Sequence, residues 1–243
     1  MGLSLATTSG KGGTGKSTVS VGLALAFVGL GRKVLLVDLD EGLRCLDLIL
    51  GVDREVTLDL SDILSGCDIS DATYSPNCID GLSVIPAPMN LGGIDAKKFS
   101  DFARKVTKKY DVVIFDFPAG IDFSLYGLLD KRTTFMTVCN PDPVSVKAAG
   151  AVCRNLADKK ITARLIINRF QPALMQNGTY SNVDDIIDLS GIRLLGIIPQ
   201  STELALLSVN HNINKRCKAA RAFKRIAERL CGKDVKLPRL KKI

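Results

Sequence analysis

The sequence predicts an α/β fold in which a mostly parallel, twisted sheet is covered by helices on both faces. Three observations support this class. Short apolar runs alternate with segments of helical periodicity along the chain. A glycine-rich loop joins the first apolar run to the first helical segment. The chain of 243 residues is 46% hydrophobic, which suits a single domain with a large core.

Seven apolar runs are expected to form the sheet. Most are rich in Val, Ile or Leu and are bounded by glycine, proline or charged residues, as buried parallel strands are. Two prolines stop the third run, and a carboxylate ends the second and the fourth. In chain order the expected strands span residues 3–8, 33–38, 81–86, 110–116, 133–139, 163–168 and 194–199.

Helices are expected between the strands, where apolar residues recur at helical spacing under a polar outer face. Within residues 95–110, Phe99, Phe102, Ala103 and Val106 mark the buried side. A loop and a short helix are expected over residues 41–51, followed by a segment over 57–64 that ends in a turn. The other expected helices span residues 19–28, 144–157, 183–189 and 217–230. The last of these has an apolar stripe that predicts a docked helix, made of Ala219, Ala220, Phe223, Ile226, Ala227 and Leu230.

Residues 10–18 read Gly-Lys-Gly-Gly-Thr-Gly-Lys-Ser-Thr and match the pattern G-x-x-x-x-G-K-[ST]. In this pattern backbone N–H groups surround a polyphosphate, the lysine reaches the β- and γ-phosphates, and the hydroxyl holds Mg²⁺. The same glycines also spell the G-x-G-x-x-G of a dinucleotide fold, with Asp38 after the next strand. Lys16 and Ser17 favour the nucleoside triphosphate, because a dinucleotide turn needs neither of them.

Polar side chains follow several of the predicted strands. Asp38 and Asp40 end the second strand, and Asp116 ends the fourth in the manner of a Walker B motif. Because open parallel sheets bind ligands at the carboxyl ends of their strands, these carboxylates are expected beside the phosphates and the metal. A helix cap or loop role is the alternative for each. After Phe117, residues 118–120 (Pro-Ala-Gly) are expected to form a mobile loop.

Asn168 and Arg169 follow the sixth predicted strand. A side-chain amide can pair with the edge of an adenine base, and a guanidinium can lie on its ring. Taken alone, the two residues leave this role undecided.

Charge is unevenly distributed along the chain, whose formal net charge is +8. From residue 215 to residue 243 there are twelve Lys or Arg residues against Glu228 and Asp234. Clustered cations favour an anionic partner such as lipid headgroups or nucleic acid, although a solvated helix face with a frayed tail is the alternative.

The seven cysteines are scattered, without a C-x-x-C pair, and His211 is the single histidine. This usage indicates a reducing compartment and argues against a structural zinc site. With neither a signal peptide nor an apolar membrane span in the sequence, a cytoplasmic location is expected.

The second lysine of the loop, Lys11, carries a family resemblance. Together with Lys16 it forms the deviant Walker A motif of the MinD/ParA group of SIMIBI-type P-loop ATPases, which the chain resembles from residue 3 to about residue 231. Four further segments resemble the septum-site-determining MinD branch of that family, in the expected order. They are residues 38–51 (the switch I segment), residues 116–121 (the switch II segment) and the two nucleotide-end segments 167–169 and 196–200.

The resemblance implies one P-loop ATPase domain over residues 1–231, a short basic tail over residues 232–243, and ATP with Mg²⁺ as cofactors. It also implies an ATP-dependent homodimer that encloses two nucleotides and hydrolyses ATP slowly. Lys11 would reach the phosphates of the partner, and Asp40 would orient the attacking water. The implied site residues are Lys11, Lys16 and Asp40 for catalysis, Gly12, Gly13, Thr14, Gly15, Lys16, Ser17 and Thr18 for phosphates, Ser17, Asp38 and Asp116 for the metal, and Asn168, Arg169, Pro199 and Gln200 for adenine.

In function, the resemblance implies a spatial switch in division-site placement or another positioning task. It further implies a MinC- or MinE-like regulatory partner and weak contact with the anionic inner face of the cell membrane. The chain departs from the MinD pattern at Ala148, where an acidic residue is usual, and in a tail too short and too poor in apolar residues for strong membrane insertion.

Two other functions are kept as alternatives. One is a ParA-like ATPase that binds nonspecific DNA through the basic C-terminal segment, for DNA segregation or for flagellar number and placement. The other is an iron–sulfur scaffold or metallochaperone, which the lack of a C-x-x-C pair disfavours.

Overall fold

The computed structural model describes residues 2–77, 79–120, 125–173, 180 and 182–240. Seven strands form one sheet in the order β3-β2-β4-β1-β5-β6-β7, and every neighbouring pair of these strands is parallel. The predicted α/β class is confirmed. In chain order the strands are β1 Leu3–Ser9, β2 Val34–Asp38, β3 Leu82–Ile85, β4 Val112–Ala119, β5 Thr134–Cys139, β6 Ala163–Phe170 and β7 Leu194–Pro199.

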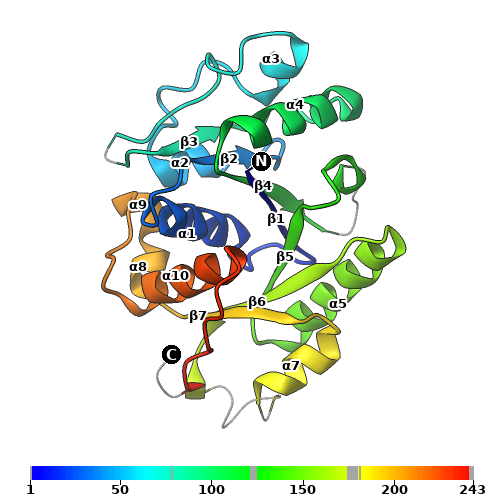
Figure 1. The fold of residues 1–243 in the computed structure, drawn as a ribbon, viewed down its shortest axis with the longest axis vertical. Helices are drawn as coiled ribbons and strands as arrows, with labels where there is room; N and C mark the ends of the chain where they lie inside the picture. The colour runs from blue at the N-terminus through cyan, green and yellow to red at the C-terminus, as the bar shows by residue number, and fades with distance from the viewer. Residues whose placement is uncertain (1, 78, 121–124, 174–179, 181, 241–243) are drawn as a thin grey trace.

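Helices cover both faces of the sheet (Figure 1). Side chains of α3 (Leu60–Ser65), α4 (Ala96–Lys109), α5 (Pro143–Asp158) and α7 (Val183–Ser190) join the core on one face. The opposite face is covered by α1 (Lys16–Val28), α2 (Leu46–Leu50), α9 (Leu207–Asn210) and α10 (Lys218–Leu230). The remaining short elements are the 3₁₀ turn η1 (Tyr126–Leu128) and α8 (Thr202–Ala205).

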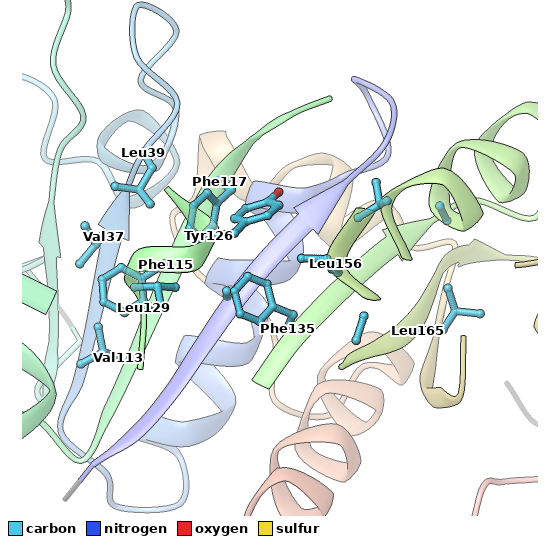
Figure 2. Close-up of a cluster of buried hydrophobic side chains, with 14 of the residues drawn as sticks. Val37, Leu39, Val113, Phe115, Phe117, Tyr126, Leu129, Phe135, Leu156 and Leu165 are labelled. Carbon is cyan, nitrogen blue, oxygen red and sulfur yellow. The ribbon is translucent and has the colours of Figure 1, made fainter. Parts of the chain in front are cut away.

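The strands are apolar on both sides because helices bury both faces. In β2, Leu35 and Val37 contribute to the core under α4, whereas Val34 and Leu36 contribute to the core under α1. Figure 2 shows the first of these cores, where Phe117, Tyr126 and Phe135 lie close together across neighbouring elements. This packing fixes the carboxyl ends of the strands, from which the candidate site is built.

Strand β4 extends further than the sequence predicts. Residues 117–119 continue the strand, so the predicted loop is wrong for Pro118 and Ala119. The physical reason is that Phe117 is buried against Tyr126, with ring centroids 4.3 Å apart, and that Ala119 pairs with Ser9 after a register shift. Gly120 then donates its N–H to Ser9 O at 2.9 Å. Ile121, the last residue of the predicted switch II segment, lies outside the described residues.

The C-terminal helix is docked, as its stripe predicts. Ala219, Phe223, Ile226 and Ala227 are buried, and so is Ala222, whereas the predicted stripe members Ala220 and Leu230 are only half-buried.

The chain beyond α10 also makes contacts. The guanidinium of Arg229 donates to Val235 O and to Leu195 O, each at 2.7 Å, and Leu240 packs against the core on the α4 side. The tail therefore passes from one face of the sheet to the other beside β7. Residues 241–243 of the predicted tail lie outside the described part.

Two absences hold for the described residues. None of their helices is long and apolar enough to cross a membrane. Their six cysteines are all free.

Candidate nucleotide-binding site

The glycine-rich loop connects β1 to α1 at the carboxyl edge of the sheet. Gly13 and Gly15 adopt positive φ angles of 76° and 85°, which glycine accepts without strain. Helix α1 begins at Lys16 with no side-chain cap and no acidic residue in its first turn. Its first N–H groups are therefore available to an anion, as the phosphate-binding pattern requires.

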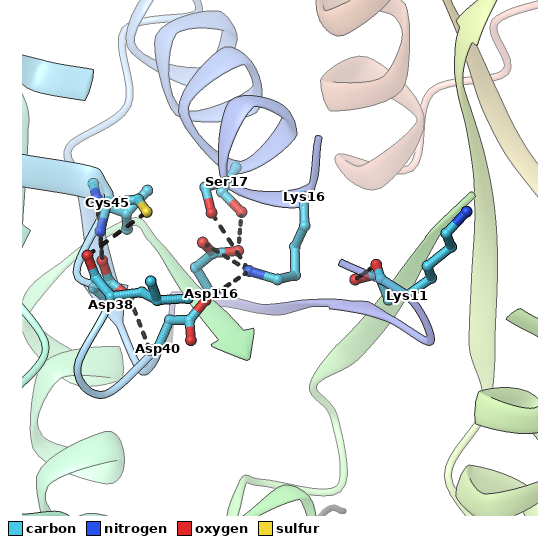
Figure 3. Close-up of polar contacts among 11 residues, drawn as sticks. Lys11, Lys16, Ser17, Asp38, Asp40, Cys45 and Asp116 are labelled. Carbon is cyan, nitrogen blue, oxygen red and sulfur yellow. Dashed lines mark hydrogen bonds and ion pairs between the residues drawn. The ribbon is translucent and has the colours of Figure 1, made fainter. Parts of the chain in front are cut away.

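Lys16 lies among acidic and hydroxyl groups (Figure 3). Its Nζ is 3.3 Å from Asp116 Oδ2, 3.9 Å from Asp40 Oδ2 and 3.4 Å from Ser17 Oγ. Ser20 donates to the other oxygen of Asp116 at 2.9 Å. The structure thus brings together residues that the sequence places in three separate segments. In this arrangement the lysine is the counter-charge of the buried Asp116 carboxylate.

Asp38 is held differently from the other two carboxylates. Its oxygens accept hydrogen bonds from the N–H groups of Asp40, Cys45 and Leu46, at 2.9, 3.0 and 3.1 Å. These bonds fold the start of the switch I segment back onto β2 and leave Asp38 fully buried. Burial, together with the negative charge of Asp116, raises the pKa of Asp38 to about 7. Burial also raises the pKa of Asp40, against the opposing effect of Lys16.

The carboxylates do not form a complete metal site by themselves. Among the described residues, no group of three or more His, Cys, Asp or Glu side chains could hold a metal ion. Mg²⁺ commonly takes only one or two protein ligands and completes its shell with water and phosphate oxygens. The oxygen donors Ser17 and Asp116 are of the type that Mg²⁺ prefers, so the donor set fits this ion when a nucleotide supplies the rest.

A small groove of about 90 Å³ lies beside the loop at the ends of β6 and β7. It is smaller than the roughly 300 Å³ of typical ligand pockets, so it suits one part of a nucleotide. All four residues predicted for adenine line it: Asn168, Arg169, Pro199 and Gln200. The groove is also lined by Gly15 and Thr18 of the loop region, and by Ser201, Leu204 and Ala205, which sequence reasoning missed.

Asn168 connects this groove to the loop. Its Nδ2 donates to Thr14 O at 2.8 Å, whereas its buried Oδ1 has no hydrogen-bond partner among the described residues. The hydroxyl of Thr14 is also buried and also has no hydrogen-bond partner among the described residues. Buried polar atoms are rarely left unpaired, so both atoms fit a ligand that offers hydrogen-bonding groups at this place. Arg169 is exposed and adopts a positive φ of 54°.

Lys11 is separated from the Lys16 cluster. Its side chain is exposed and points away from Lys16 in Figure 3. The loop backbone at this position is fixed by Ser9 Oγ, which donates to Lys11 O at 3.1 Å. The Lys11 side chain is thus directed away from Lys16 and the carboxylates around it.

An apolar rim lies beside the switch I segment. Glu41 accepts hydrogen bonds from Gly92 N and Ile94 N at 3.2 and 3.0 Å, which joins switch I to the loop after β3. Leu43 on one of these segments is 72% exposed, and Leu91 on the other is 82% exposed. Sequence reasoning missed this rim because its two halves are about fifty residues apart.

Comparisons with known proteins agree with this geometry. Residues 5–213 match the family model described as the CobQ/CobB/MinD/ParA nucleotide binding domain. The septum site-determining protein MinD of Synechocystis sp. is 33% identical over 94% of this chain and 89% of its own length.

Solved structures of similar proteins share the fold. The MinC:MinD cell division protein complex of Aquifex aeolicus contains a chain with a TM-score of 0.87 and 30% identity, and 98% of each chain is covered. The septum site-determining protein MinD of Pyrococcus horikoshii, complexed with Mg-ADP, has a TM-score of 0.82 and 27% identity over 95% of this chain and 96% of its own. The fold is therefore that of the MinD/ParA P-loop NTPases.

Proposed function

Since this chain belongs to the CobQ/CobB/MinD/ParA family of P-loop nucleotide-binding ATPases, we propose that it is a MinD-like, Mg²⁺-dependent ATPase whose ATP-driven dimerisation works as a slow spatial switch. The observation that carries the proposal is the position of Lys16. It lies at the uncapped start of α1, in contact with Asp116, Asp40 and Ser17.

In this proposal the phosphates are bound by the loop and the first turn of α1. Backbone N–H groups of residues 12–18 and the Nζ of Lys16 would hold them, and Ser17 and Asp116 would face the metal. Asp38 would act on the coordination shell of the metal indirectly, because its hydrogen bonds position the backbone of switch I. Bound Mg²⁺ would supply charge neutralisation at the phosphoryl oxygens. Asp40 is only half-buried, so it can reach solvent, and its role would be to orient the attacking water.

The adenine base would lie in the groove that Asn168, Arg169, Pro199 and Gln200 line. The Oδ1 of Asn168, which has no partner among the described residues, is an acceptor suited to an amino group on the base edge. Leu204 and Ala205 would add apolar contacts to the ring.

Two observations support a homodimer. The side chain of Lys11 points away from Lys16 of the same chain, which suits a cation that acts on the nucleotide of a partner. Leu43 of switch I and Leu91 of the adjoining loop expose apolar surface, at the edge that a second copy would cover. A cation donated in trans would make hydrolysis depend on assembly.

The cellular task that fits best is division-site placement or a related positioning task, in the cytoplasm and at the inner face of the membrane. The MinD names of the relatives and the MinC:MinD complex among the structural neighbours support a MinC-like partner, with a MinE-like activator as a further candidate. The basic residues of α10 and the tail would give weak contact with anionic lipids.

A ParA-like function is the second candidate. Lys218, Arg221 and Lys224 are exposed on α10, and this cationic face would also suit the phosphates of nonspecific DNA. Retention on DNA that requires ATP and falls steeply with salt would favour this candidate. Pelleting with anionic vesicles without DNA retention would favour the membrane-bound one.

The test compares three lysine variants for ATP binding, ATP hydrolysis and mass in solution. Lys16→Ala should lose ATP binding. Lys11→Ala should bind ATP within a few-fold of the wild type but hydrolyse it at least about 100-fold more slowly and stay monomeric, since a trans-acting cation is worth that much or more. Lys105→Ala, at an exposed position on α4, is the control and should behave as wild type. A Lys11→Ala protein that dimerises and hydrolyses ATP normally would exclude the trans role.

A further inference from the structure

A second cavity lies at the edge of the sheet opposite the nucleotide site. Its volume is about 490 Å³, and it opens where β5 and β6 begin. The strands run from this edge to the phosphate loop, a distance of roughly 20 Å along a strand of six or seven residues. The cavity therefore belongs to neither the phosphate loop nor the adenine groove.

The lining of this cavity is strongly cationic. The segment before β5, the connection from α5 to β6, and β6 itself all contribute positive charges around an apolar floor that includes Leu129 and Phe135. Thr134 and Thr162 add hydroxyl groups. The charged lining residues are Lys131, Arg132, Lys159, Lys160 and Arg164, with Asp130 as the carboxylate among them.

Asp130 is paired with one of these cations, Arg132. The Nε of Arg132 lies 3.0 Å from Asp130 Oδ1, and its Nη2 lies 3.0 Å from Oδ2. The other lining cations are at positions 131, 159, 160 and 164, so positive charge outweighs negative charge in the lining. Converging cations raise the local concentration of an anion and strengthen its binding, more so in a concave site than on a flat surface.

The backbone of Lys160 is the second observation. Lys160 has a φ of 60°, in the left-handed region that favours glycine. It ends α5 in a Schellman motif, in which Lys160 N donates to Ala157 O at 2.8 Å and Ile161 N donates to Leu156 O at 2.9 Å. At the ends of α2 and α7 glycine takes the left-handed position, whereas at the end of α9 His211 does. A lysine here is strained, and it places a cation at the cavity.

The dipole of α5 explains only some of the positive charges that line this cavity. Cations near a helix C-terminus interact favourably with the helix dipole, which suits Lys159 and Lys160. The helix dipole does not explain why a lysine occupies a left-handed backbone position. Nor does it explain why Lys131 and Arg164, which belong to other elements, line the same cavity.

We propose that this cavity binds a compact, soluble polyphosphate compound, separately from the nucleotide at the phosphate loop. Its volume lies within the 300–1,000 Å³ typical of small-molecule sites, and its charges and hydroxyl groups are donors suited to phosphate oxygens. A concave site of this size favours a soluble ligand over a lipid headgroup presented on a bilayer.

The first test titrates inorganic tripolyphosphate into the full-length Lys16→Ala protein by calorimetry, because that variant removes the main phosphate ligand of the loop. We expect saturable binding that is at least tenfold weaker when Lys160→Gln and Arg164→Gln are added, since charged hydrogen bonds are lost. The control pair Lys105→Gln and Lys108→Gln lies on the exposed side of α4 and should leave binding unchanged.

A second variant separates binding from folding. Lys160→Gly should keep or raise the melting temperature, because glycine accepts the left-handed backbone, while tripolyphosphate binding weakens. The proposal is overturned if tripolyphosphate does not bind, if the Lys160 and Arg164 variants bind it normally, or if these residues matter only for pelleting with phosphatidylglycerol vesicles. ATP binding by the otherwise wild-type protein is measured in parallel, so a failure of the proposed ATPase function is recognised separately.

Discussion

Single residues at the carboxyl edge of the sheet explain how the site is organised before a nucleotide binds. Lys16 takes Asp116 as its counter-ion at 3.3 Å, and Asp38 is enclosed by three backbone N–H groups. Burial alone disfavours the charged form of Asp38 and raises its pKa. In the proposed function, a bound Mg²⁺ would favour the charged form of Asp38, which would couple nucleotide binding to the shape of switch I.

Asn168 provides a direct residue-scale test of the adenine groove. Asn168→Ala removes the hydrogen bond to Thr14 O and should weaken ATP binding by about tenfold, while the free energy of unfolding of the nucleotide-free protein falls by about 1 kcal/mol. Equilibrium ATP binding and urea unfolding measure the two effects.

Asn168→Asp is the matched variant for this test. It keeps the size of the side chain but turns an acceptor toward the carbonyl of Thr14, so it should be worse than alanine in both measurements. Unchanged ATP affinity in both variants would remove Asn168 from the nucleotide site.

At the scale of elements, the P-loop is packed tightly against α5. A β-carbon on Gly10 would lie 2.3 Å from Ala148 O and 2.6 Å from its carbonyl carbon, both of them backbone atoms. Helix α5 therefore packs directly against the loop through the backbone of Ala148, the residue at which the sequence departs from the MinD pattern. A shift of α5 would be transmitted to the loop directly.

Gly10→Ala should therefore destabilise the protein. We expect a loss of about 2 kcal/mol or more in the free energy of unfolding. The added β-carbon would clash with backbone atoms of α5, which cannot move aside as the end of a flexible side chain can. Gly12→Ala is the control, since a β-carbon added to Gly12 would meet nothing within 4 Å and the φ of Gly12 is not positive. Urea unfolding of both variants checks this, and equal stabilities would mean that the loop and α5 are not in firm contact.

Strands and helices could be predicted from the sequence where the local pattern of apolar residues determines them. All seven strands were expected from their apolar runs, and most ends agree within one or two residues. The extension of β4 could not be predicted, because Pro118 and Gly120 read as a loop and the burial of Phe117 depends on distant residues. Helix α8 has four residues, too few for periodicity, so its contribution to the adenine groove was missed although Ser201-Thr202 is a typical helix start.

At the scale of the whole molecule, charge and apolar surface are divided among separate regions. The carboxyl edge of the sheet carries the candidate nucleotide residues and the apolar rim of Leu43 and Leu91. The opposite edge carries the cationic cavity, and α10 carries the basic face. The basic C-terminal segment was evident from composition, but the cavity was not, because its cations come from short segments of ordinary composition that only the fold brings together.

In the proposed function, ATP holds two copies of this chain together, and the mass of the protein in solution depends on this directly. Sedimentation velocity of the wild-type protein with Mg²⁺ and a non-hydrolysable ATP analogue should shift the 26.1 kDa chain to a dimer, whereas Mg²⁺ and ADP should leave it a monomer. A protein that binds the analogue to saturation and still sediments as a monomer would contradict the account.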